Sequence, residues 1–193
     1  MVNTVSPTYA LEIMTDEGGA GMDGLLRHRA YDLHGILNGI DYDTWNPATD
    51  SNVPVPFTVE TLEARIGNRH ALQERVGLPQ RDDIPLVAMV SRLTWQKGLD
   101  LMGPVLHQLM SGFSGEAQFV LLGTGDYEYE HMFATMASHH PEKMTAVLAY
   151  EADLAPLIYA GSDIFLMPSL FEPCGLGQLI AMRYGSVPLV RHT

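Results

Sequence analysis

Strand-length apolar runs recur along the second half of the chain, each bounded by glycine, proline or polar residues. The runs are almost continuously apolar instead of alternating with polar residues, which favours strands that are buried on both faces of a sheet. They lie at residues 85–90, 118–122, 145–149, 163–167 and 187–190. We therefore predict that these strands form one sheet within residues 83–193.

Stretches with helical spacing separate these runs. Leu99, Met102, Leu106 and Leu109 stand at i, i+3, i+7 and i+10, which places them on one face of a helix. Similar stripes occupy residues 129–136, 154–158 and 176–183. Strands that alternate with helices indicate an α/β, Rossmann-like fold, with a parallel sheet and helices on both of its faces.

The first 82 residues have a less regular pattern. Thr4–Ile13 is predicted as a strand, and the glycine-rich, acidic segment Asp16–Gly24 is predicted as a loop. Asn46–Pro56 contains three prolines and is also predicted as a loop. Thr58–Val76 has helical spacing and is followed by Gly77, a residue that commonly ends helices.

The balance of charge excludes some classes of partner. The 193 residues carry 11 Lys and Arg against 23 Asp and Glu, a formal net charge of −12. A broad nucleic-acid surface needs a basic patch, so we expect no nucleic-acid partner, and we expect any anionic ligand to be held by a few placed cations. No apolar run reaches the ~20 residues of a membrane helix, so we expect no membrane partner. The single cysteine, Cys174, favours a reducing compartment.

Two of the few cations follow the first predicted strand of the sheet. Arg92 and Lys97 come between this strand and the next helix. Ligands of open α/β sheets bind outside the carboxyl ends of the strands, and guanidinium and ammonium groups suit phosphate oxygens. The pair therefore fits a diphosphate site. The alternative is a solvated loop with ordinary surface cations.

The next two strand ends carry glycines and a tyrosine. Gly123 and Gly125 allow a ribose or base to approach the backbone closely, or they form a plain turn in which Asp126 caps the next helix. Position 128 is Glu, so the full G-x-G-x-x-G fingerprint is absent, which argues against an NAD-dependent oxidoreductase. Tyr150 either stacks on a base or packs half-buried against the protein.

The loop after the fourth strand of this sheet carries a carboxylate beside a helix start. Glu172 stands between an aromatic residue and a proline, and the amides of Gly175 and Leu176 open the next helix. Free amides at a helix N-terminus receive phosphate or sugar oxygens, and a fixed carboxylate binds sugar hydroxyls or balances positive charge at a sugar carbon. The alternative is that Glu172 merely caps the helix.

Several long motifs then resemble one family, the bacterial glycogen synthases and plant starch synthases. Residues 38–41 with 45–47 resemble the interdomain segment of that family, residues 91–94 with 96–100 its donor-phosphate motif, and residues 171–176 with Gln178 its signature loop. The match continues through Val187-Pro188 to Arg191 and Thr193 and covers nearly the whole chain. Two positions depart from the family pattern: Gly177 replaces a threonine, and Trp95 stands where a small or polar residue is usual.

This resemblance implies a retaining glucosyltransferase of the two-domain GT-B type. Such enzymes add glucose from ADP-glucose, or UDP-glucose in some members, to the non-reducing end of an α-1,4-glucan, and they need no metal or other cofactor. By motif match, the catalytic set is Glu172, Arg92 and Lys97. The substrate-binding set is Gly175, Leu176, Tyr150, Gly123, Gly125, Gln178 and Thr193.

The resemblance also implies a domain organisation. Residues 1–45 are expected to hold the end of an N-terminal domain and the interdomain segment, residues 46–82 a linker and an entering helix, and residues 83–193 the nucleotide-sugar-binding domain, incomplete at its C-terminus. We therefore expect a donor-binding half that is inactive alone, with the acceptor glucan bound through the absent N-terminal domain. A non-catalytic nucleotide-sugar-binding module is the alternative. The expected compartment is the bacterial cytoplasm, with the plastid as alternative.

Overall fold

The computed structural model describes residues 1–112 and 116–192, which fall into two compact units. The first unit contains Met1–Ile40, Phe171–Leu176 and His192, and the second contains Asp41–Leu170 and Gly177–Arg191. The loop of Glu172 therefore belongs to the first unit, while the sheet that precedes it belongs to the second. The linker and helix of residues 46–82 belong to the same unit as the sheet.

The second unit contains a parallel sheet in the order β5-β4-β3-β6-β7. Its strands are β3 (Leu86–Val90), β4 (Gln118–Leu122), β5 (Met144–Val147), β6 (Ile164–Met167) and β7 (Val187–Val190). The chain moves outwards from β3 to β5 and then returns to the other side of β3. The order therefore reverses between β3 and β6, which is where open α/β sheets bind ligands. The predicted parallel sheet is confirmed.

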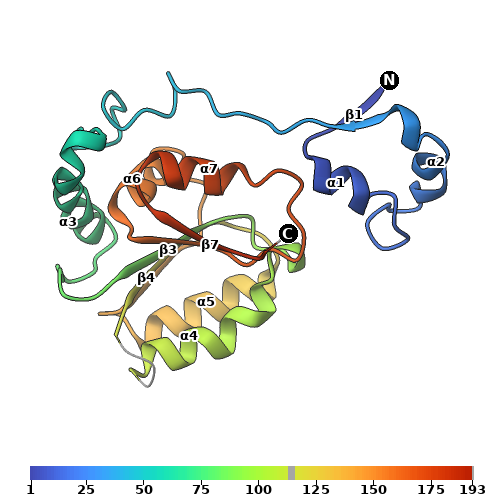
Figure 1. The fold of residues 1–193 in the computed structure, drawn as a ribbon. Coiled ribbons are helices and arrows are strands. Elements are labelled where there is room, and N and C mark those ends of the chain that lie inside the picture. The colour runs from blue at the N-terminus through green and yellow to red at the C-terminus, as the bar shows by residue number, and fades with distance from the viewer. Residues whose placement is uncertain (113–115, 193) are drawn as a thin grey trace. The chain divides into compact units, whose positions relative to one another are not determined.

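Helices cover both faces of this sheet (Figure 1). On one side lie α4 (Met102–Met110) and α5 (Tyr127–His139). On the other lie α3 (Arg65–Arg75), α6 (Leu154–Gly161) and α7 (Leu176–Arg183). The helical stripe predicted from Leu99 is confirmed only in part, because two short 3-10 turns, η3 (Trp95–Lys97) and η4 (Leu99–Leu101), precede α4.

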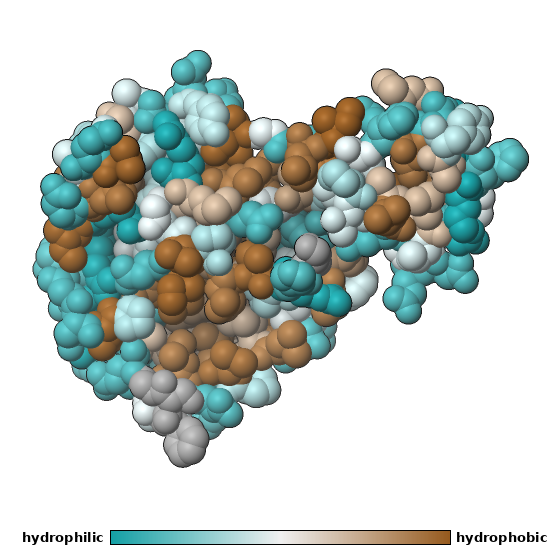
Figure 2. All heavy atoms as spheres, viewed as in Figure 1, coloured by the Kyte–Doolittle hydropathy of each residue, from teal (hydrophilic) through white to brown (hydrophobic). Residues whose placement is uncertain are grey.

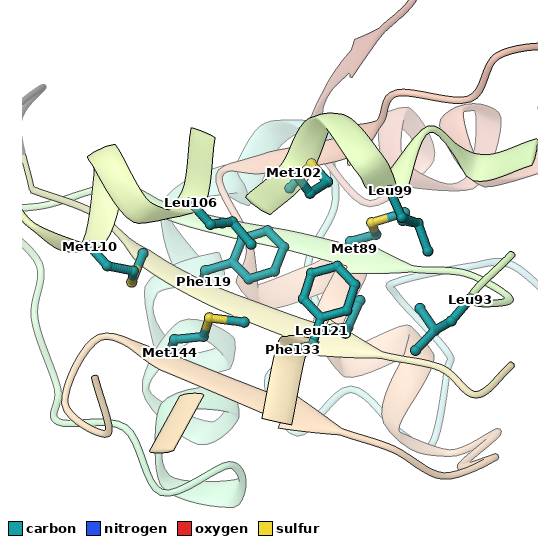
Figure 3. Packing of buried hydrophobic residues seen from close by; sticks show 10 residues of the cluster. All are labelled: Met89, Leu93, Leu99, Met102, Leu106, Met110, Phe119, Leu121, Phe133 and Met144. Carbon is teal, nitrogen blue, oxygen red and sulfur yellow. The ribbon is translucent and has the colours of Figure 1, made fainter. Parts of the chain in front are cut away.

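The core lies in two layers because neighbouring residues of a strand point to opposite faces. Phe119 and Leu121 of β4 belong to the layer under α4 and α5, together with Phe133 (Figure 3). Val120 and Leu122 belong to the layer under α3 and α6. Strand β4 is buried along its whole length, as its continuous hydrophobicity predicts.

Strand β7 differs from this pattern. Val187 and Leu189 are more than half exposed, and brown apolar atoms gather over this strand in Figure 2. The prediction of strands that are all buried on both faces is therefore wrong for β7. The physical reason is that β7 ends the described strand order, with β6 as its neighbour on one side.

Residues 58–76 form a helix in two pieces. The 3-10 helix η2 (Val59–Ala64) precedes α3, and Thr61 within η2 has non-helical backbone angles. Thr58 caps η2, because its hydroxyl accepts a hydrogen bond from the Glu60 amide while its own amide donates to the Thr61 hydroxyl. Helix α3 then packs on α6.

The predicted strand Thr4–Ile13 is wrong. Strand β1 (Val2–Thr4) ends early, because the Ser6 hydroxyl accepts a hydrogen bond from the Tyr9 amide (3.0 Å) and Pro7 opens helix α1 (Pro7–Glu12). A serine cap followed by proline is a helix start, and this signal overrides the apolar run. Strand β1 pairs in parallel with β2 (Leu33–Gly35), and α2 (Asp23–His28) and η1 (Ala30–Asp32) lie between them in sequence.

Within the described ranges, no helix has the length and hydrophobicity needed to cross a membrane.

Residues 41–50 dock on α6 and on the end of α7. The Trp45 ring meets the rings of Tyr159 and Tyr184 edge-on, with centroids 6.2 and 6.3 Å away. The buried Tyr184 hydroxyl donates to an Asp50 carboxylate oxygen (2.6 Å). Burial, and then this hydrogen bond, raise the pKa of Tyr184. These contacts fix residues 41–50, which are called the linker below, against the sheet domain.

Replacing Tyr184 by phenylalanine should lower the free energy of unfolding by about 1.5 kcal/mol, because the ring stays in place while a hydrogen bond to a carboxylate is lost. Urea denaturation of both proteins measures this loss. Tyr42→Phe is the matched control, since the Tyr42 ring lies under Arg183 and the substitution keeps that ring. Equal midpoints for Tyr184→Phe and the unsubstituted protein would contradict the assigned bond.

Candidate functional site

A pocket of about 450 Å³ opens at the carboxyl ends of three adjacent strands. All three strand ends contribute to its lining, which includes Ser91 and Arg92 after β3, Gly123 and Thr124 after β4, and Tyr150 and Glu151 after β5. Trp45 of the linker and Ala155 of α6 complete part of the wall. A concave, mainly apolar cavity with a few polar groups at the carboxyl edge of a parallel sheet has the properties of a small-molecule site.

The floor of this pocket is made by two loops joined through their backbones. The Ser91 amide donates to Leu122 O (3.0 Å) and the Leu93 amide to Thr124 O (2.9 Å), so the ladder continues past β3 and β4. A Cβ atom on Gly123 would lie 1.8 Å from Ser91 O, and one on Gly125 would lie 2.2 Å from Leu93 O. The close backbone approach predicted for these glycines therefore takes place between the two loops. Their contact with a ligand stays a prediction.

Helix α5 starts directly after this floor. Asp126 is its N-cap residue, the position that one of the two sequence alternatives gave it, but the Asp126 side chain makes no capping hydrogen bond. Glu130 on the first turn accepts from the Gly125 amide instead (2.9 Å). The carboxylate of Glu130 thus holds the second glycine in place.

The two predicted phosphate-binding cations occupy different parts of one loop. Arg92 is exposed and lines the pocket. Lys97 lies on η3, and the following residue, Gly98, is in the left-handed conformation (φ 66°). A Cβ atom added to Gly98 would lie 2.2 Å from Pro168 O, so the backbone approaches too closely there for any side chain. The Leu170 amide donates to Gln96 O (2.9 Å), which joins the loops after β3 and β6. Lys97 is therefore held at the point where the strand order reverses.

Glu172, Gly175 and Leu176 lie in the segment that belongs to the first unit. Gly175 has φ 77°, which favours glycine, and it directly precedes α7. Gln178 lies in the first turn of α7 and is half-buried. Thr193 is outside the described residues. The sugar-binding roles of these residues stay predictions.

Tyr150 is 91% exposed and lines the pocket, so the half-buried packing alternative is wrong. The neighbouring Glu151 also lines the pocket and forms an ion pair with Arg75 (3.3 Å). Glu151 and Trp45 were not predicted from the sequence as pocket residues. The signal for Glu151 was its position beside Tyr150 at a strand end. Trp45 is far from the sheet in sequence and gave no such signal.

Among the described residues, no three or more His, Cys, Asp or Glu side chains are grouped so that they could hold a metal ion. The Cys174 side chain is half-buried.

Comparison with known proteins gives the class first. A family model described as "Glycosyl transferases group 1" matches residues 84–191, more than half of the chain, so this chain belongs to the group 1 glycosyl transferases. A second model, "Starch synthase catalytic domain", matches residues 1–28. The predicted glycosyltransferase fold is confirmed.

The individual relatives are glycogen and starch synthases. The glycogen synthase of Thermosipho africanus (strain TCF52B) is 50% identical over the whole chain, and that of Clostridium perfringens (strain 13 / Type A) is 53% identical over 98% of it. The solved catalytic domain of starch synthase IV from Arabidopsis thaliana, bound to ADP and acarbose, matches 98% of the chain with a TM-score of 0.88 and 42% identity. The chain spans 39% of each of these three proteins. The resemblance to this family, and its GT-B fold, are thereby confirmed.

Proposed function

We propose that this chain is the donor-binding part of a glycogen or starch synthase, which transfers glucose from ADP-glucose to the non-reducing end of an α-1,4-glucan with retention. The observation that carries the proposal is the pocket itself. It combines an exposed Tyr150 at one strand end with Arg92 at another, in a chain about half identical to glycogen synthases.

The geometry of the sheet suggests how a nucleotide lies in the pocket. Neighbouring strands are about 5 Å apart, so the ends of β5 and β3 are separated by roughly 10 Å. That span suits an extended nucleoside diphosphate, with its base stacked on Tyr150 and its phosphates at Arg92. Lys97 supplies a second positive charge where the strand order reverses. Both cations stabilise the charge that develops on the departing diphosphate, and we propose that no metal is needed.

The sugar end of the donor is assigned to the loop of Glu172. In this proposal Glu172 binds the donor glucose, the amides of Gly175 and Leu176 bind sugar and phosphate oxygens, and Gln178 is a further substrate-binding residue. The departing phosphate accepts the proton of the acceptor hydroxyl on the same face of the sugar. Because the relatives are much longer than this chain, we expect it to bind donor nucleotide but not to elongate glucan alone. The bacterial relatives favour a bacterial cytoplasm as the compartment.

Thermal denaturation with ADP and with NAD tests the proposal. ADP at about ten times its Kd should stabilise the fold by about 1.4 kcal/mol, a rise in Tm of roughly 3–5 °C for a chain of this size. NAD at the same concentration should leave Tm unchanged, and glucose incorporation into glycogen should be absent for this chain. A Tm that ADP does not move, or that NAD moves as much, would refute the donor site.

A further inference from the structure

One carboxylate lines a pocket that is proposed to hold a polyanion. Glu151 follows β5, and its side chain is 34% exposed. A carboxylate near the phosphates would repel them, but β5 is separated from β3 and Arg92 by the whole width of β4, roughly 10 Å from strand centre to strand centre. Glu151 therefore lies at the end of the pocket that is far from the diphosphate, next to Tyr150.

The orientation of Glu151 is fixed by the neighbouring helix. Arg75, the last residue of α3, contacts Glu151 Oε2 through Nη2 at 3.3 Å. The end of α3 is tied to β5, because the Thr145 hydroxyl donates to Val76 O (3.0 Å). The Glu151 backbone carbonyl accepts from the Leu154 amide at the start of α6 (3.3 Å). The side chain is thus held between a strand end and two helices.

This arrangement leaves one oxygen of Glu151 for a ligand. Among the contacts of the described residues, only Oε2 is engaged, by Arg75. The surrounding wall is built from small apolar side chains such as Ala149, Ala152 and Ala155. An ionised carboxylate accepts hydrogen bonds and donates none. The base end of the pocket therefore offers an acceptor to whatever edge of the base faces it.

We propose that Glu151 reads the exocyclic amino group of adenine and so selects ADP-glucose over UDP-glucose, with Arg75 as its positioning residue. The inference rests on the proposed function and deepens it. Adenine presents an amino donor at N6, whereas uracil presents a carbonyl acceptor at O4. The carboxylate binds the first and repels the second, because two acceptors that face each other leave both unpaired.

Inosine diphosphate gives the sharpest test, because it keeps the purine and replaces the N6 amino group with a carbonyl. By calorimetry, the unsubstituted protein should bind ADP roughly tenfold more tightly than inosine diphosphate or UDP. Glu151→Gln should bring the ADP to inosine diphosphate ratio close to one or reverse it, since a glutamine amide can donate to the carbonyl. Glu142→Gln removes the same charge at an exposed position outside the pocket and should leave the ratio unchanged.

The outcomes separate the two proposals. Failure of every nucleotide to bind the unsubstituted protein would refute the donor site itself. Binding with equal affinity for ADP and inosine diphosphate, or an ADP preference that survives Glu151→Gln, would leave the donor site standing and overturn the role of Glu151. If Glu151→Gln weakened the binding of ADP and of inosine diphosphate equally, Glu151 would be assigned to the ribose, and its role in recognising the base would also be overturned. Arg75→Ala should lower the preference for ADP over inosine diphosphate, and Arg75→Lys should retain part of it. The Tm of each variant controls for folding.

Discussion

Replacing Gly123 by alanine should lower the free energy of unfolding by roughly 3 kcal/mol, the upper range for overpacking a close contact. The added Cβ would lie 1.8 Å from Ser91 O, so the two loops that form the pocket floor must separate. The hydrogen bond from the Ser91 amide to Leu122 O would be strained with them. Urea denaturation followed by circular dichroism measures the loss. The same variant should bind ADP more weakly, because Arg92 is carried on the displaced loop.

Gly39→Ala is the matched control for this substitution. A Cβ on Gly39 would meet no atom within 4 Å, and the backbone of Gly39 is not in the left-handed region. Its free energy of unfolding should therefore change by less than about 0.5 kcal/mol. A loss at Gly123 no greater than at Gly39 would show that the two loops do not approach as closely as described.

Replacing Arg92 by alanine should raise the Kd for ADP roughly 10- to 150-fold, which corresponds to about 1.5–3 kcal/mol for hydrogen bonds to a charged phosphate. Lys97→Ala is expected to fall in the same range. Calorimetry measures both. Arg92→Lys should recover only part of the affinity, since lysine keeps the charge but not the planar fork.

Arg81 serves as the control for loss of positive charge. It precedes β3, at the amino end of the strand, and pairs with Asp83 and Glu116. Arg81→Ala should leave the Kd for ADP within about twofold, because the site lies at the other end of the sheet. If Arg81→Ala and Arg92→Ala lowered the affinity for ADP equally, the effect would come from the overall charge of the protein and not from a contact. An unchanged Kd for Arg92→Ala would show that Arg92 is not part of the site.

The sheet was predictable because its signals are local. Continuous apolar runs such as Gln118–Leu122 have the length of buried strands, and the strand ends then indicate where Arg92 and Tyr150 should lie. The N-terminal segment was mispredicted because one hydrogen bond, from the Tyr9 amide to the Ser6 hydroxyl, outweighs the apolar pattern that follows. The exposure of β7 was also missed, since burial depends on neighbours that the strand's own residues do not reveal.

The site was predictable only in part, because some of its residues are brought together by tertiary structure. Trp45 reaches the pocket across more than forty residues from β3, and Arg75 meets Glu151 across seventy-six positions. Neither contact leaves a periodic signal. Gly123 and Gly125 were recognised as unusual, but their reason is the neighbouring loop, which a single segment of sequence does not contain.

The double role of Trp45 has an energetic consequence. Its ring lines the pocket and also packs against Tyr159 and Tyr184, so it helps to hold the linker on the sheet domain. A ligand that contacts this indole binds more tightly to molecules whose linker is docked than to molecules whose linker is undocked. Because the coupling is reciprocal, the bound ligand stabilises the docked linker by the same free energy. Ligand binding in the pocket and docking of the linker are therefore coupled, and each favours the other by the same free energy.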